Sequence, residues 1–144
     1  MPNVIYKELG FPIVLVNPPM VTVRGHEVPD VNLRQLQDSV FHLLVLKPSR
    51  FTGAEIRFIR KHHHLRQVDL AEVLNRANHT IVSQWESRGD EFTGMDYNTE
   101  LVLRIWMATT TSLSDQIPEL LNSRLKGLAP CQDAQMQVSL TTAV

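Results

Sequence analysis

The sequence predicts a mainly α-helical chain with a small unit of β-strands at its start. Apolar residues recur at intervals of three and four through much of residues 32–127, which is the spacing of one helix face. Short β-branched runs broken by proline and glycine occupy residues 10–29, and this composition is typical of short strands and turns. With 144 residues, 43% of them apolar, the chain can form one compact domain or two small ones.

The first predicted elements are three short strands. Residues 11–17 form a β-branched apolar run that ends at two prolines, and residues 20–23 read as a second strand. Gly25 lies in a turn and is free to adopt a positive φ, after which residues 27–28 begin a third strand. We expect an antiparallel meander over residues 10–29. Strands so few and short need a helix, or a second chain, to cover one face.

A helix is expected to follow this meander. Asn32 can cap its first turn, with Gln35 as the reciprocal partner three residues later. Pro48 ends the helix, because a proline disfavours α geometry in the residue before it. Residues 1–49 are therefore predicted to form a small strand-plus-helix unit, which is a possible dimerisation unit.

The remaining helices are predicted from caps and spacing. Thr52 and Glu55 match a capping box that opens a helix running to about His64. Asn98 is expected to cap a later helix whose inner side carries Leu101, Ile105 and Trp106, or Val102. A last helix tolerates Pro118 only in its first turn and ends at Gly127. No periodic apolar pattern follows, so residues 128–144 are expected to be a flexible tail.

Between these helices, residues 66–75 and 78–88 read as two short helices joined by a tight polar turn. Asn75 suits the turn because asparagine tolerates left-handed geometry. The inner residues, which we expect to be buried, are Leu70, Ala71, Leu74, Val82 and Trp85. Two helices joined by so short a turn can present the second one to a DNA major groove.

The outward side chains of the second helix suit that role. Asn78 is the expected N-cap. The residues expected to reach base edges are His79, Thr80, Ser83 and Gln84, because glutamine can pair bidentately with adenine, histidine can donate to guanine, and hydroxyl groups adapt to either.

The charge distribution limits how strongly such a helix pair would bind DNA. The net charge is −1, but residues 50–90 carry seven basic against five acidic residues. Arg66 and Arg76 are expected to contact phosphates on charge alone. The excess is small, so we expect moderate, salt-sensitive binding that pairing of two chains would strengthen.

The same residues carry a resemblance to a known family. Leu65, Gln67, Leu70, Ala71, Leu74 and the Ser83–Glu86 ending resemble the lambda-repressor-like helix-turn-helix of the Cro/C1 (XRE) family. Residues 52–60, with the preceding 20–25 and 28–30 segments, resemble the helix-turn-helix half of MqsA-type antitoxins and related regulators. The likeness is good over residues 52–88 and loose over 20–108. The chain lacks the zinc-binding cysteines of the MqsA N-terminal half, and its stretch from Leu74 to Trp85 is one residue longer than usual.

The resemblance implies a Cro/C1-type DNA-binding domain over residues 50–127. It implies base reading by His79, Thr80 and Gln84, and DNA-backbone contacts from Gln67 and Asn78. The expected function is a sequence-specific transcriptional regulator, such as a repressor, that binds a palindromic operator on double-stranded DNA as a homodimer. The alternative is an antitoxin or protein-interaction module that binds a toxin or another partner protein.

Other classes of function find little support in the sequence. No apolar run is long enough to span a membrane and no signal peptide is apparent, so a cytoplasmic protein without a membrane role is expected. Cys131 is the only cysteine, which excludes an internal disulfide and a cysteine-based zinc site. Consecutive helical residues point about 100° apart, so His62–His64 is expected to be solvated or to face phosphate rather than to bind metal. We expect no enzyme activity, cofactor or metal.

Overall fold

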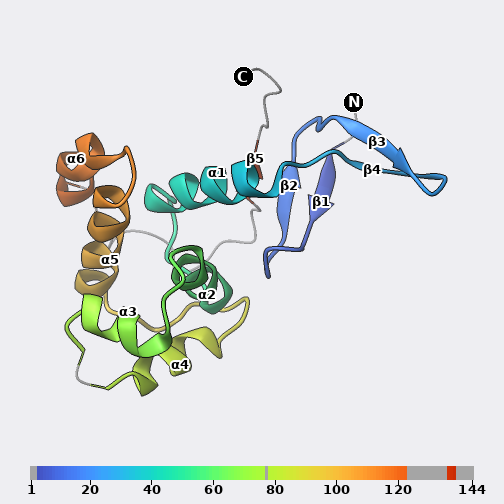
Figure 1. Cartoon of the computed structure of the whole chain (residues 1–144). Helices are drawn as coiled ribbons and strands as arrows, with labels where there is room; N and C mark the ends of the chain where they lie inside the picture. The colour runs from blue at the N-terminus through green and yellow to red at the C-terminus, as the bar shows by residue number, and fades with distance from the viewer. Residues whose placement is uncertain (1–2, 77, 123–135, 139–144) are drawn as a thin grey trace. The chain divides into compact units, whose positions relative to one another are not determined.

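The computed structural model describes residues 3–76, 78–122 and 136–138, which form a mixed α and β structure rather than a mainly α one (Figure 1). The strands are β1 (Val4–Tyr6), β2 (Ile13–Leu15), β3 (Met20–Val23), β4 (His26–Pro29) and β5 (Met136–Val138). The helices are α1 (Leu33–Val45), α2 (Gly53–His62), α3 (Gln67–Val73), α4 (Thr80–Glu86), α5 (Tyr97–Thr109) and α6 (Ile117–Asn122), with a 3-10 helix, η1 (Ser114–Gln116), before α6.

The chain divides into two compact units, and the division differs from the predicted one. Met1–Val40 and Asp133–Val144 form unit 1, while Phe41–Gln132 forms unit 2. The boundary falls inside α1, between Val40 and Phe41, rather than at residue 49. The predicted end of the second domain at Gly127 lies outside the described residues.

Unit 1 contains a three-stranded sheet that the sequence did not predict. β2 pairs antiparallel with β1 and parallel with β5, and Ile13 and Leu15 of β2 are fully buried. The predicted meander was wrong in its pairing, since β2 joins the two chain ends instead of β3. The predicted flexible tail was likewise wrong for Met136–Val138, which gain backbone hydrogen-bond partners from β2; the rest of residues 128–144 lies outside the described part.

The other two strands of unit 1 form a separate hairpin, as residues 20–28 predicted. β3 and β4 pair antiparallel, with Met20 opposite Pro29 and Val23 opposite His26. The connecting residues Arg24 and Gly25 have φ values of 52° and 81°. Two successive positive φ values are the geometry of a tight hairpin turn, and glycine accepts it without steric cost.

The starts of α1 and α2 confirm their predicted caps. The Gln35 backbone N–H donates to the Asn32 side-chain oxygen (3.1 Å). Thr52 and Glu55 form the complete capping box of α2, in which each side chain accepts a hydrogen bond from the other residue's backbone N–H. These contacts satisfy N–H groups that have no partner within the helix.

The helix pair also forms as predicted, although both helices are shorter than residues 66–75 and 78–88. The expected inner residues are all buried, and α4 packs against both α3 and α2 (Figure 1). Asn75 has a φ of 56°, so it supplies the left-handed turn residue that the sequence assigned to it. At the far end of α4, a Cβ on Gly53 would lie 2.4 Å from the Trp85 carbonyl oxygen, so α2 approaches α4 as closely as only glycine allows.

The prediction for α5 was wrong in its cap and in its buried face. Asp96, not Asn98, caps the helix by accepting from the Thr99 N–H (3.1 Å). The buried residues are Thr99, Glu100, Leu103, Arg104, Met107 and Ala108, whereas Val102 is 49% exposed. Two of these buried residues, Glu100 and Arg104, are charged and form an ion pair.

The last helix agrees with its prediction where the structure describes it. Pro118 lies in the first turn of α6 and Leu120 is buried. Among the helices described, none combines the length and apolar character that a membrane crossing requires.

Candidate nucleic-acid interface

The outer edge of α4 carries the side chains that the sequence predicted to read bases. Thr80, Ser83 and Gln84 are exposed, and their spacing of three and four residues places them on one face of the helix. The opposite face is buried through Val82 and Trp85. α4 therefore separates a polar outer edge from an apolar inner one within two turns.

The start of α4 differs by one residue from the prediction. His79, which is exposed, occupies the N-cap position and makes no side-chain capping bond. Asn78 lies one residue earlier, and its side-chain oxygen accepts a hydrogen bond from the Thr80 backbone N–H (2.9 Å). Asn78 thus still satisfies a free N–H of the first turn. Ala77 lies outside the described residues.

Glu86 holds α4 in place against α2 and α3. Its carboxylate is almost fully buried and accepts two hydrogen bonds from Arg60, at 2.6 and 3.0 Å. Gln67 Nε2 donates to the same carboxylate (3.3 Å), and Arg57 Nε lies 3.4 Å from it. Charge-assisted bonds of this kind are stronger than neutral ones and fix geometry. The orientation of α4 is therefore set by a buried acid at its last residue.

The four residues predicted to contact the DNA backbone differ in their exposure and in their hydrogen-bond partners. Gln67 is half-buried and bonded to Glu86, while Asn78 is exposed. Arg66 precedes α3 with a side chain that is 79% exposed and paired with Asp69 (3.0 Å). Asp69 also accepts from the Arg66 backbone N–H (2.8 Å), which makes it the acceptor that caps the start of α3.

Arg76 is directed to the start of α5. Its guanidinium donates to Asp96 Oδ1 (3.0 Å) and to the Thr99 hydroxyl. The hydrogen bond from the Thr99 hydroxyl, with further help from the Arg76 charge, lowers the pKa of Asp96 below its usual value. Arg76 therefore links the turn of the helix pair to α5, a role that its charge alone did not reveal.

Sequence reasoning missed three exposed cations near the helix pair. Arg57 and Lys61 lie four residues apart on α2, and Arg88 follows α4. Arg57 belongs beside α4 because it approaches Glu86 at the end of that helix. The local basic excess was the available signal, but it could not show which cations face outward.

The histidine run packs against aromatic rings, so the expected solvated or phosphate-facing cluster was wrong. His62 stacks on Phe41 with ring centres 4.4 Å apart, and His63 meets Phe41 and Trp106 edge-on, each at 4.9 Å. Only His64 is exposed. Burial, and then the neighbouring His62 and His64, lower the pKa of His63.

No metal site accompanies these histidines in the described residues, where no three His, Cys, Asp or Glu side chains are placed to hold an ion. Cys131 lies outside that part of the chain.

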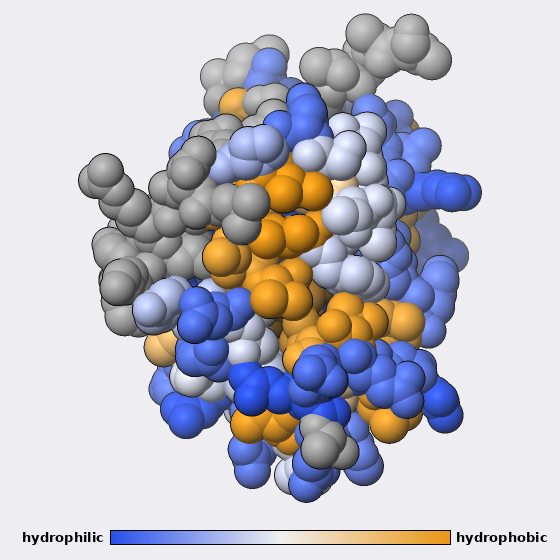
Figure 2. All heavy atoms as spheres, turned by 90° about the vertical axis from the view of Figure 1, so that its left-hand side faces the viewer, coloured by the Kyte–Doolittle hydropathy of each residue, from blue (hydrophilic) through white to orange (hydrophobic). Residues whose placement is uncertain are grey.

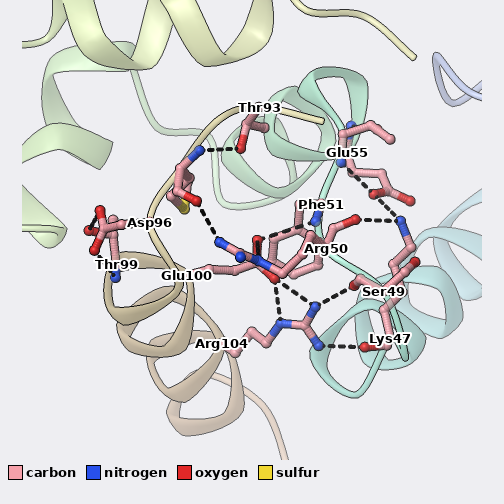
Figure 3. Close-up of polar contacts among 12 residues, drawn as sticks. Lys47, Ser49, Arg50, Phe51, Glu55, Thr93, Asp96, Thr99, Glu100 and Arg104 are labelled. Atoms are coloured by element: carbon pink, nitrogen blue, oxygen red, sulfur yellow. Dashed lines mark hydrogen bonds and ion pairs between the residues drawn. The ribbon is translucent and has the colours of Figure 1, made fainter. Parts of the chain in front are cut away.

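A second buried network of charged side chains connects α5 to the segment that leads into α2 (Figure 3). Glu100 is fully buried and accepts from Arg50 (2.9 Å), from the Phe51 backbone N–H (3.2 Å) and from Arg104 (2.8 and 3.2 Å). The Arg104 guanidinium also lies over the Phe51 ring, 4.4 Å from its centre. One acid thus ties α5 to the segment that leads into α2.

The remaining donors of this network bind the link between α1 and α2. Arg104 donates to the backbone carbonyl oxygens of Val45, Lys47 and Ser49. Lys47 Nζ donates to the Arg50 carbonyl (3.1 Å) and forms an ion pair with Glu55 (2.6 Å), the acid of the α2 capping box. Side chains of Arg104 and Lys47 therefore satisfy several carbonyl groups of this link, while the Phe51 carbonyl accepts from the Thr93 backbone N–H.

Comparison with known proteins gives no family assignment. No protein-family model, no curated protein and no solved structure matches this chain.

Proposed function

We propose that this chain is a sequence-specific transcriptional regulator of the Cro/C1 type that binds a palindromic operator on double-stranded DNA as a homodimer. The observation that carries the proposal is the exposed polar edge of α4, formed by Thr80, Ser83 and Gln84. In this proposal the chain acts in the cytoplasm as a DNA-binding protein, not as an enzyme, and takes no cofactor.

The chemistry of that edge supports base recognition. A glutamine amide presents a donor and an acceptor together, which matches the major-groove edge of adenine, and hydroxyl groups can serve either base type. Glu86, Arg60 and Gln67 fix the helix beneath this edge, so its side chains are presented from a rigid support. His79 lies at the start of the same helix and is exposed.

The surrounding charge supports weak attraction to phosphate. Arg57, Lys61 and Arg88 are exposed, but Arg57, like Arg66 and Arg76, has a carboxylate partner that reduces its attraction to DNA. With so few cations, one copy would hold a duplex poorly. Two copies spaced by whole helical turns gain both affinity and selectivity.

Selection of bound fragments from randomised duplex DNA tests the proposal. A two-fold symmetric consensus is expected, and binding should weaken steeply as salt rises. Recovery of no sequence, or of sequences bound equally well by a Thr80→Ala/Gln84→Ala double variant, would rule out the assigned reading edge.

A protein-binding role is the second proposal, and the outer face of α5 favours it. Apolar residues gather on the side of the molecule where α5 and α6 lie (Figure 2). Val102 is 49% exposed and Leu101 and Ile105 are half-buried, while both charged residues of α5, Glu100 and Arg104, are buried. An apolar surface of this kind suits a toxin or another partner protein. Co-purification with the product of a neighbouring reading frame, lost in Val102→Glu but kept in Gln84→Ala, is the expected result.

A further inference from the structure

The β3–β4 hairpin of unit 1 leaves its side chains and one edge open. Every residue of β3 is exposed, and the large apolar side chains of Met20, Val21, Val23 and Val28 are between 37% and 49% exposed. In the part of the chain that the structure describes, β3 pairs only with β4. A two-stranded sheet alone in water is marginally stable, so this hairpin gains from another strand.

One hydrogen bond shows which backbone groups face the open edge. The Asp30 N–H donates to the Pro19 carbonyl (2.7 Å), so the backbone of Pro19 points toward β4. Backbone groups alternate in direction along an antiparallel strand. The N–H and C=O groups of Val21 and Val23 therefore point toward β4 as well, and those of Met20 and Thr22 point outward.

The two edges of the hairpin are protected unequally. By the same alternation, Glu27 and Pro29 turn their backbones to the outer edge of β4. Proline has no N–H and a charged side chain discourages pairing, so that edge resists strand addition. The β3 edge, Met20–Val23, contains neither proline nor charge. The hairpin therefore offers one edge for pairing and closes the other.

We propose that a second copy of this chain adds its own β3 to this edge, antiparallel and about a two-fold axis, to form the homodimer. This inference rests on the homodimer of the proposed function. Met20 would pair with the partner's Thr22 and Thr22 with the partner's Met20, giving about four backbone hydrogen bonds. In the register centred on Thr22, Met20 would have to pair with the partner's Arg24, whose φ of 52° is not extended. The register centred on Val21 is therefore the one in which both outward residues, Met20 and Thr22, are paired.

Charge favours a second copy as the occupant. In this register Val21 lies on the two-fold axis, opposite the partner's Val21. Because β3 contains no charged residue, the two strands meet without repulsion between like charges. The same register places each exposed Arg24 opposite the partner's Pro18, with the two Arg24 side chains at opposite ends of the pairing. Like charges therefore do not meet across the two β3 strands.

Proline substitutions on the two edges test the pairing. Thr22→Pro removes an outward N–H of β3, and Glu27→Pro makes the same change on the β4 edge; neither removes a bond between β3 and β4. Sedimentation of the full chain should show a wild-type dimer, a Kd raised about tenfold or more in Thr22→Pro, and little change in Glu27→Pro. A monomeric wild type, or equal effects of the two prolines, would overturn the proposal.

A charge-swap experiment keeps the test decisive if Thr22→Pro disturbs the hairpin itself. Val21→Glu and Val21→Lys each place like charges face to face across the axis, so each variant alone should be monomeric. Their equimolar mixture should recover the dimer, which damage to the fold could not do. Failure of the mixture to associate, or dissociation by Val102→Glu in place of these variants, would place the interface elsewhere.

DNA binding is measured separately on the same proteins. If the variants change dimerisation as expected but the dimer does not bind DNA, the β3 interface is supported and the regulator proposal is wrong. If the Thr22→Pro protein is still a dimer and binds a symmetric operator, the regulator proposal is supported and the β3 interface is wrong.

Discussion

The Gln67 side-chain amide donates to Glu86 Oε1 (3.3 Å), which ties the first residue of α3 to the last residue of α4. Arg60 of α2 binds the same carboxylate, so three helices meet at one buried acid. Any function of the α4 outer edge depends on this junction, because it fixes the direction in which that edge faces.

Replacing Glu86 should therefore loosen the helix pair. Glu86→Gln leaves the Arg60 guanidinium, only 13% exposed, without its counter-charge, and we expect a loss of about 3 kcal/mol in the free energy of unfolding. Urea denaturation measures this change. Glu72→Gln, on the exposed side of α3, should stay within about 0.5 kcal/mol of wild type. Equal effects of the two substitutions would contradict the role given to Glu86.

Glu100 should be still less tolerant of substitution. Glu100→Gln leaves Arg50 and Arg104 buried together without an anion, so the expected cost is about 3–5 kcal/mol. Thermal and urea unfolding both report it. Glu91→Gln, at an exposed position, serves as the matched control. If Glu100→Gln loses less than about 1 kcal/mol more than this control, the network does not stabilise the fold.

Gln84 should affect DNA selectivity and leave stability unchanged. Gln84→Ala is expected to reduce discrimination between the selected operator and its single-base variants by about 1–3 kcal/mol at the position it reads. Binding titrations at fixed salt measure the difference. Gln35→Ala makes the same chemical change at an exposed position of α1 and should leave selectivity intact. Unchanged selectivity in Gln84→Ala would remove this residue from the reading edge.

Stability should fall as the solution becomes acidic, in part through His63. Its pKa in the folded protein lies below the usual 6.5 because burial disfavours the charged ring. The unfolded chain therefore binds the proton more tightly, so this group costs nothing well above pH 6.5 and destabilises the fold as pH falls through that value. Denaturation of wild type and His63→Gln across this range should show a weaker pH dependence in the variant. An unchanged dependence would contradict the prediction.

Local patterns determined much of the fold. The capping box of Thr52 and Glu55 and the left-handed turn at Asn75 depend on neighbours within a few residues, so their residue types were sufficient. The buried faces of α3 and α4 followed from spacing because, apart from Glu86, apolar residues occupy them. For the same reason, the spacing also predicts which residues form the outer edge of α4.

Contacts between distant segments were decided only by the tertiary structure. The apolar spacing of α5 did not predict that Glu100 and Arg104 are buried, because Arg50, which also binds Glu100, is far away in the chain. The pairing of β2 with β5 joins residues near opposite ends, and nothing in either short strand specifies its partner. Likewise, the histidine run lost its expected solvent contact because Phe41 and Trp106 lie against it. A residue's own type fixes its local preference, whereas its surroundings depend on which remote groups can satisfy its charge or hydrogen bonds.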